Sequence, residues 1–305
     1  MSTISVLLPV FNAKQFVAQA VSSILRQTFG DFELLIIDDG SSDGSEAVLR
    51  SLAASDARIR LTRRENKGLV LTLNEMLGMA SSPFVARMDA DDVAEPTRFE
   101  RQLREFERDS TLLAVGSDVY SIDSKGRRLM TIRMPRTHEA IDAHNMEVVN
   151  GAGMCHPSMM FRSAAFELAG GYRKEYWPAE DADLILRICE KGRVANIPVP
   201  LLSYRVHSDS IGHMHASRQR AALYRAACAA AARRGTAPPE TGLAELHAHK
   251  KAQIESPVAR DIKWAWWALK GGNLRTARSL AFSAVVRAPF ERAAWVVLGC
   301  AIRGR

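Results

Sequence analysis

The sequence predicts an α/β fold, with a mostly parallel, Rossmann-like sheet flanked by helices and an α-helical C-terminal extension. Two observations support this. In the first hundred residues, short apolar runs alternate with segments of helical periodicity, the pattern of strand–helix units in a parallel sheet. From about residue 214 the chain is rich in alanine and arginine with helical periodicity, broken only around residues 235–239.

The strand–helix units follow one another in order. Predicted strands occupy residues 4–10, 33–37, 58–62 and 84–88, and the helices between them begin near residues 16, 46 and 68. Ligands of such sheets bind outside the carboxyl ends of the strands. The acidic loops after the second and fourth strands are therefore expected to open at the same edge.

Beyond residue 95 the pattern loosens. Helices are expected at 97–108 and 181–191, extended chain at 112–118 and 157–161, and an irregular, substrate-facing stretch from about 119 to 150. A domain boundary is predicted between residues 212 and 213, which separates a domain over 1–212 from the extension over 213–305. Residues 257–305 suggest an antiparallel helix pair that bends at Gly271-Gly272, with four tryptophans in its seam: Trp264, Trp266, Trp267 and Trp295.

Charge is distributed unevenly. From residue 211 onward, sixteen Lys and Arg stand against five Asp and Glu, a balance of +11, which leaves −4 for the remainder of a chain with net charge +7. A basic tail favours an anionic partner such as phospholipid head groups, although a solvated, arginine-rich helical surface has the same composition. Nucleic acid is not expected as a partner, because no recognisable binding module accompanies the charge.

Cysteine spacing and hydropathy narrow the class of protein. The four cysteines lie far apart with no CxxC pair, so neither a zinc ribbon nor a disulfide framework is indicated, and a reducing compartment fits. No signal-like segment opens the sequence, and the apolar run at 293–302 is about half the length needed to cross a bilayer. The sequence thus predicts a cytoplasmic protein that could lie peripherally at the inner face of the cytoplasmic membrane.

Two acidic loops carry the candidate chemistry. In Asp89-Ala90-Asp91-Asp92, alternating carboxylates project to different sides, so that one could hold Mg²⁺ or Mn²⁺ while another binds a hydroxyl. The alternative is a polar turn before the next helix. Asp38-Asp39-Gly40-Ser41 could bind a base or a ribose, or Ser42 or Asp43 could simply cap a helix. No GxGxxG follows the first strand, which argues against a dinucleotide-binding domain.

Taken together, the ordered motifs resemble the family 2 glycosyltransferases. The resemblance spans roughly residues 3–210, and its motifs lie at 5–12, 22–28, 33–43, 66–68 with Asn74, 88–92, 170–172 and 180–187. It implies a GT-A fold, a nucleotide-diphosphate sugar donor and inversion at the anomeric carbon. Uridine diphosphate is the commonest carrier in the family. The polymerising members' Gln-x-x-Arg-Trp motif is absent, which favours transfer of a single sugar.

The resemblance also implies roles for individual residues. Asp39 would contact the nucleobase, Asp89 the ribose, and Asp91 a Mn²⁺ or Mg²⁺ ion that bridges the diphosphate. The rest of the donor site comes from the matching motifs: Pro9, Val10, Phe11, Asn12, Lys67 and Ala90.

Asp181 corresponds to the general base, a role that suits a carboxylate placed to take the acceptor proton. Glu180 and Asp183 remain rival bases, and a helix cap is the structural alternative for Asp181. His207 matches a further metal or diphosphate contact, and Arg205 is an alternative phosphate partner.

The sequence therefore predicts a metal-dependent, inverting glycosyltransferase that acts in cell-surface glycan or polysaccharide biosynthesis. The acceptor hydroxyl could belong to a glycan, a lipid-linked molecule or a small molecule, and self-association stays open. One alternative is a nucleotidyltransferase, which would need a glycine-rich basic loop after the first strand. The other is a non-catalytic nucleotide-sugar-binding or scaffold protein that works through its tail.

Overall fold

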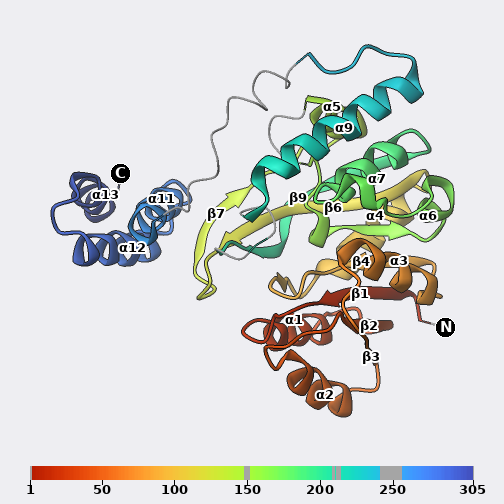
Figure 1. Ribbon diagram of the computed structural model, residues 1–305, viewed down its shortest axis with the longest axis horizontal. Coiled ribbons are helices and arrows are strands. Elements are labelled where there is room, and N and C mark those ends of the chain that lie inside the picture. The colour runs from red at the N-terminus through yellow and green to blue at the C-terminus, as the bar shows by residue number, and fades with distance from the viewer. Residues whose placement is uncertain (1, 148–151, 208–209, 211–213, 241–255, 305) are drawn as a thin grey trace.

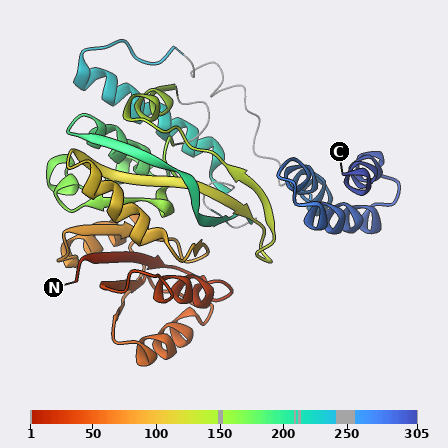
Figure 2. The ribbon, with the colours of Figure 1, turned by 180° about the vertical axis from the view of Figure 1, so that it is seen from behind.

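The computed structural model describes residues 2–147, 152–207, 210, 214–240 and 256–304. Its main feature is one mixed sheet, ordered β3–β2–β1–β4–β8–β6–β9–β5, with β7 paired to β6. Helices pack on both faces of the sheet, and three C-terminal helices lie beyond its β7 end (Figures 1 and 2). This mixed α/β architecture with C-terminal helices confirms the predicted fold class.

The N-terminal half of the sheet is parallel, as predicted. Its elements are β1 (Ile4–Val10), α1 (Val17–Leu25), β2 (Phe32–Asp38), α2 (Ser45–Ser55), β3 (Ile59–Arg63), α3 (Leu69–Met79) and β4 (Phe84–Arg87). Along β1, Val6 and Leu8 belong to the core shared with α1 and α2, whereas Leu7 packs with α3 on the opposite face. Helices on both faces explain why β1 is apolar at nearly every position.

The second half of the sheet contains antiparallel pairs. Its elements are β5 (Val93–Ala94), α4 (Arg98–Arg108), β6 (Leu112–Ile122), β7 (Arg128–Ile132), α5 (His138–Glu147), η1 (His156–Ser158), β8 (Met160–Arg162), α6 (Ala164–Ala169), η2 (Lys174–Tyr176), α7 (Glu180–Cys189) and β9 (Arg193–Arg205). The prediction of an irregular stretch over 119–150 was wrong, because β6 runs on into a hairpin with β7 and a helix follows. Buried polar residues such as Ser117 and Asp118 break the alternation that would reveal β6.

The C-terminal region is helical, with α9 (Ala216–Arg234), α11 (Pro257–Lys270), α12 (Leu274–Arg287) and α13 (Arg292–Arg303). Two of these helices, α11 and α12, meet at the predicted Gly271-Gly272 bend, but the predicted pair was incomplete: α13 packs with them around Trp264, and Trp295 is more than half exposed. Gly271 lies so close to β7 that a Cβ there would be 2.4 Å from the carbonyl oxygen of Leu129. The predicted boundary between residues 212 and 213 lies outside the described residues. Within the described chain, every helix is too short or too polar to cross a membrane.

Candidate active site

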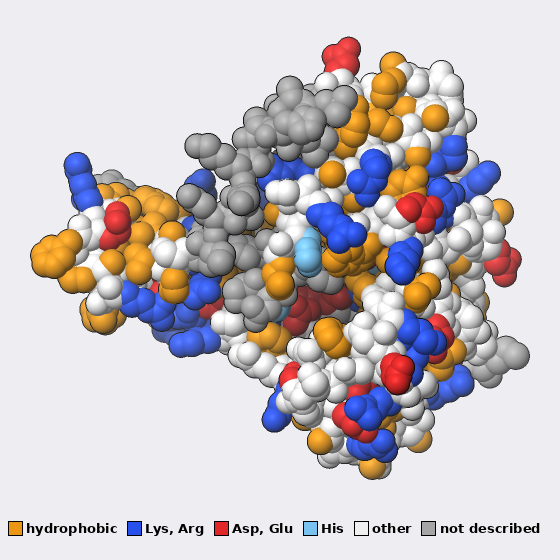
Figure 3. Space-filling model, in the orientation of Figure 1, with side chains coloured by type: hydrophobic (Ala, Val, Ile, Leu, Met, Phe, Trp, Pro, Cys, Tyr) orange, Lys and Arg blue, Asp and Glu red, His pale blue; other side chains and the backbone are white. Residues whose placement is uncertain are grey.

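A cavity of about 1460 Å³ opens where β1, β2 and β4 end. Parallel pairing sets this geometry, since Val10 lies opposite Asp38 and Leu7 opposite Arg87, so the loops that follow emerge together. All twelve residues that the sequence assigns to the site line the cavity: Pro9, Val10, Phe11, Asn12, Asp39, Lys67, Asp89, Ala90, Asp91, Glu180, Asp181 and His207. Figure 3 shows the hollow with acidic side chains at its floor.

Three carboxylates gather after β4. One oxygen from each of Asp89, Asp91 and Asp92 lies within 4.8 Å of the others. Asp92 is buried; its Oδ1 accepts from the Arg205 amide at 2.8 Å, whereas its buried Oδ2 has no hydrogen-bond partner in the described chain. Burial, and then the charges of Asp91 and Asp89, raise the pKa of the Asp92 carboxyl well above its ordinary value. Crowded oxygen ligands of this kind fit a hard divalent cation.

His207 extends this cluster from the end of β9. Its Nε2 lies 2.8 Å from Oδ2 of Asp91, and its ring packs against Phe16. The imidazole is therefore held beside one carboxylate of the cluster, where it could share a metal ion or orient Asp91.

Arg205 does not face the cavity as a free phosphate partner, so that alternative was wrong. Its guanidinium is buried and donates to the backbone carbonyls of Asp91, Asp123 and Ser124 and to the Gln19 side chain. The residue holds the acidic loop against β9 instead.

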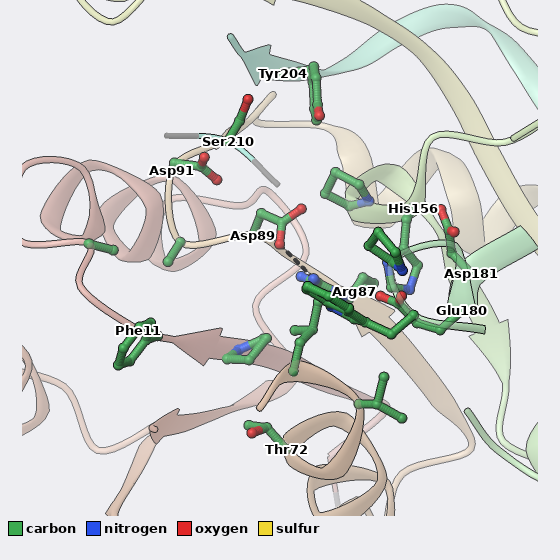
Figure 4. Close-up of a pocket in the computed structure, with 18 of the residues that line it drawn as sticks. Phe11, Thr72, Arg87, Asp89, Asp91, His156, Glu180, Asp181, Tyr204 and Ser210 are labelled. Carbon is green, nitrogen blue, oxygen red and sulfur yellow. Dashed lines mark hydrogen bonds and ion pairs between the residues drawn. The ribbon is translucent and has the colours of Figure 1, made fainter. Parts of the chain in front are cut away.

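Arg87 is a site residue that the sequence reasoning missed. Its buried guanidinium makes a 2.5 Å ion pair with Asp89 and also donates to the carbonyl of Met88 (Figure 4). A single arginine at the end of a short apolar strand carries no motif that would identify it. In the structure it places one positive charge beside the acidic cluster. This charge lowers the pKa of both Glu180 and Asp181, but burial raises both pKa values by more.

The β1 and β2 loops are tied together at the other end of the cavity. Asn12 has a φ of 51°. Its side-chain Oδ1 accepts from the Ser42 backbone amide at 2.8 Å, and its backbone amide donates to the Ser41 hydroxyl oxygen at 2.9 Å. Asparagine tolerates this left-handed conformation better than most residues do.

The Asp39 carboxylate accepts hydrogen bonds from other residues of the chain. It accepts from the backbone amides of Lys67 and Gly68, each at 2.9 Å, and from Arg64. Lys67 thus reaches Asp39 through its backbone, while its Nζ lies 3.6 Å from a Glu75 carboxylate oxygen. Asp39 therefore shapes the turn at Lys67 and Gly68 that forms this wall of the cavity.

The first turn of α7 supplies the remaining acids. Burial raises the pKa of the Asp181 carboxyl to about 6, and burial followed by the Asp181 charge raises that of Glu180 to about 8. Figure 4 shows both side chains on the α7 side of the cavity, across from Asp89 and Asp91. Asp183 was wrong as a rival base, because it is fully buried and pairs with Arg187 at 2.6 Å. Asp181 Oδ1 also accepts from the Ala182 amide at 2.8 Å.

Aromatic and basic side chains complete the wall between α7 and α9. Nε2 of His156 lies 2.7 Å from the Tyr172 hydroxyl, and burial lowers the pKa of this histidine well below its ordinary value, so the ring is neutral. Trp177 is flanked by Arg218, whose guanidinium lies 4.5 Å from the ring centroid, and by His215. Tyr172 belongs to the motif at 170–172, whereas His156, Trp177, His215 and Arg218 carry no sequence signal, since they converge only in the fold.

Comparison with known proteins gives consistent matches. Residues 5–168 match the family model described as "Glycosyl transferase family 2". The chain is 32% identical over 211 residues to the O-antigen biosynthesis glycosyltransferase WbnJ of Escherichia coli, covering 68% of this chain and 81% of that one. It is also 32% identical over 212 residues to EpsE of Bacillus subtilis, whose name describes a glycosyltransferase, covering 68% and 74%.

Two solved structures share the fold. The mannosyltransferase PcManGT from Pyrobaculum calidifontis, in complex with GDP-Man and Mn²⁺, superposes with a TM-score of 0.59 at 19% identity, over 99% of this chain and 80% of that one. S. aureus TarS 1–349 in complex with UDP-GlcNAc superposes with a TM-score of 0.59 at 14% identity, over 99% and 92%. At these identities the likeness shows a common GT-A-like architecture.

Proposed function

The chain belongs to glycosyl transferase family 2, and from this premise we propose that it transfers a single sugar from a nucleotide-diphosphate donor to an acceptor hydroxyl with inversion. The observation that carries the proposal is the placement of Asp181 across one cavity from the cluster of Asp89, Asp91 and Asp92. A direct displacement requires this separation, because the base and the leaving diphosphate act on opposite sides of the sugar.

The pKa values favour Asp181 over Glu180 as the base. With a pKa of about 6, Asp181 is mostly ionised at neutral pH and can accept a proton. Glu180, at about 8, is mostly protonated and would serve as a hydrogen-bond donor instead. A base with a pKa just below neutral also retains enough proton affinity to assist the attacking hydroxyl.

The proposed reaction is one concerted displacement. As the acceptor oxygen forms its bond to the anomeric carbon, its proton passes to an oxygen of Asp181. The bond between the anomeric carbon and the phosphate oxygen breaks, and its electron pair leaves with the nucleoside diphosphate. Asp181 therefore ends the reaction protonated, and the sugar has the opposite anomeric configuration.

The acidic cluster fits a divalent cation, for which we propose Mn²⁺ or Mg²⁺. Asp91 and His207 would hold it, and a carboxylate oxygen of Asp92 lies within 4.8 Å of ligand atoms of Asp89 and Asp91. When bound, such an ion supplies positive charge that stabilises the departing diphosphate. Arg87 fixes Asp89, which we assign to the ribose of the donor.

The donor end of the cavity would be formed by the Pro9–Asn12 segment and the turn that Asp39 holds. We propose a uridine-diphosphate sugar as the first candidate donor. A guanosine-diphosphate sugar is the second, because the Pyrobaculum relative by fold was solved with GDP-Man and Mn²⁺. For the acceptor we propose the hydroxyl of a glycan, since the related WbnJ carries an O-antigen biosynthesis name.

A donor panel tests this function. Release of nucleoside diphosphate from uridine- and guanosine-linked sugars would be measured with Mn²⁺ or Mg²⁺, and then with EDTA. We expect release to stop with chelator and in Asp91→Ala, and to fall about 10²- to 10⁴-fold in Asp181→Asn. Asp109→Asn, a partly buried acid outside the cavity, is the matched control. Undiminished release in EDTA, or a fully active Asp181→Asn, would overturn the proposal.

A further inference from the structure

Exposed apolar side chains concentrate at the C-terminal end of the molecule. Of the eleven large hydrophobic residues that are exposed in the described chain, six lie between residues 282 and 302, and Phe290 is completely exposed. These six form what we call the C-terminal apolar face: Phe282, Val286, Phe290, Trp295, Val296 and Ile302. Scattered exposed hydrophobic residues need no explanation, but a concentration of this kind marks an interaction surface.

Two of these side chains share one side of α12. Phe282 and Val286 lie one turn apart, in the same row as Arg278. Because Arg278 donates to the carbonyls of Ala301 and Ile302, this side of α12 borders α13.

The loop between the two helices continues the face. The indole Nε1 of Trp295 donates to the Pro289 carbonyl at 2.8 Å, which holds the ring against the loop that carries Phe290. The Trp295 ring is thus held at the loop that also carries the fully exposed Phe290.

The same helices carry a concentrated positive charge. Residues 256–305 contain nine Lys and Arg against two Asp and Glu, a balance of +7 that equals the net charge of the whole chain. One of the two acids, Asp261, is buried and paired with Arg287. Arg275, Arg292 and Arg303 are exposed, and the described residues offer them no ion-pair partner. Figure 3 shows basic and hydrophobic side chains together over these helices.

The attachment to the sheet leaves this face open. The unit contacts β7 through the close approach of Gly271 to Leu129, and the turn before β7 through a 2.8 Å hydrogen bond from Arg127 to Ser279. Figures 1 and 2 show α13 on the side of the unit away from the sheet. The apolar face is therefore available to a partner while the unit stays docked.

We propose that α12, α13 and their connecting loop dock this protein on an anionic lipid bilayer surface. Tryptophan and phenylalanine suit the boundary between head groups and acyl chains, and exposed arginines suit anionic head groups. A second copy is disfavoured, because it would bring two units of charge +7 face to face. No described helix can span the bilayer, so the contact would lie in the plane of the interface. This proposal is independent of the proposed function.

Sedimentation of the full chain with lipid vesicles tests the proposal. We expect binding to phosphatidylcholine vesicles that contain phosphatidylglycerol, weaker binding without it, and loss at high salt. Phe290→Ser combined with Trp295→Ser should lower the partition coefficient about tenfold or more. Arg275→Gln and Arg303→Gln should each lower it about fivefold. Leu168→Ser, a similarly exposed leucine on α6, is the matched control.

Tryptophan fluorescence gives a second test that includes the wild-type chain and so does not depend on the folding of the double variant. In the wild-type chain, brominated lipid should quench part of the tryptophan emission, and Trp295→Phe should remove that part while vesicle binding persists. Equal binding to vesicles by the wild type and the Phe290/Trp295 double variant would overturn the proposal. So would a dimer, detected by light scattering, that the double variant converts to monomer. Release of nucleoside diphosphate from free donor should be unchanged in every variant, which separates this proposal from the proposed function.

Discussion

Nε2 of His207 lies 2.8 Å from Oδ2 of Asp91, although 116 positions separate the two residues in the chain. The contact joins the end of β9 to the loop after β4, at the acidic cluster. It makes the imidazole either a ligand of the proposed metal ion or the group that orients Asp91.

Removing this imidazole should weaken metal binding without abolishing the fold. We expect His207→Ala to raise the dissociation constant for Mn²⁺, measured by calorimetry with nucleotide present, about 10- to 100-fold. Asp91→Ala should have a larger effect. His138→Ala, on α5 and away from the cavity, is the control. Unchanged Mn²⁺ affinity in His207→Ala would remove the residue from the metal site.

Two aspartates of the same short motif should differ in their effect on stability. Asp89→Ala leaves the buried Arg87 guanidinium without its carboxylate, which should cost on the order of 2–4 kcal/mol in the free energy of unfolding. Asp91 is partly exposed, and its direct ion pair in the described chain is with His207 rather than with a buried arginine, so Asp91→Ala should change stability by less than about 1 kcal/mol. Urea unfolding of the metal-free variants measures both. Equal losses of unfolding free energy in the two variants would show that the ion pair between Arg87 and Asp89 does not stabilise the fold.

The activity should depend on the ionisation of Asp181. Because its pKa is raised to about 6, we expect kcat/KM to fall as the pH drops below about 6, when the base becomes protonated. The residual activity of Asp181→Asn should lack this acidic limb. Initial rates between pH 5 and 9, at saturating metal, measure the profile. A limb that persists at the same pH in Asp181→Asn would assign the titration to another group.

Glu180 should make the protein less stable as the pH rises. Its pKa is about 8 in the folded chain and near 4.5 when unfolded, so between these values the folded state binds more protons. Stability is therefore greatest below about pH 4.5 for this group and declines through pH 8.

Glu180→Gln should flatten this decline. Compared with the wild type, the variant should gain on the order of 2–4 kcal/mol between pH 5 and pH 9. Glu167→Gln, exposed on α6, should leave the pH dependence unchanged. Parallel curves for Glu180→Gln and the wild type would contradict the assigned pKa.

The close approach of Gly271 to β7 should tolerate no side chain. Its Cβ would lie 2.4 Å from the Leu129 carbonyl oxygen and 2.9 Å from Met130 Cα, both backbone atoms that cannot turn aside. Gly271→Ala should loosen the C-terminal helices and raise hydrogen exchange in β7, at a cost of about 1–3 kcal/mol. Gly299→Ala, whose new methyl group would meet only the end of Arg303, should be neutral. Unaltered exchange in β7 would refute this docking.

Where local patterns suffice, the sequence predicts the structure well. Residues 4–10, 33–37 and 84–88 were predicted as strands of a parallel sheet, and the structure confirms them within a residue or so. The acidic loops after them meet at one edge because parallel strands end on the same side. The roles of the individual site residues stay predictions, although the structure brings all twelve around one cavity.

The sequence pattern did not predict strands with buried polar residues, and it did not predict the third helix of the C-terminal unit. β9 was not predicted, and β6 was cut short, because partners elsewhere in the chain satisfy their polar positions. One such partner is Arg136, which pairs with the buried Asp118. Trp295 follows the helical period that suggested a packed seam, but it lies on a third helix, α13, whose buried side carries Ala294, Val297 and Ala301 instead.

Periodicity and ordered motifs alone indicate the α/β class, the family resemblance and the carboxylates of the site, because these features depend on residues that are close together in the sequence. Which carboxylate is ionised was decided by the fold, since burial and the charge of Arg87 act through space. The same holds for Arg205, whose donors are consumed by distant carbonyls, and for Asp183, which is paired inside α7. Protonation, pairing and exposure depend on neighbours that only the folded chain brings together.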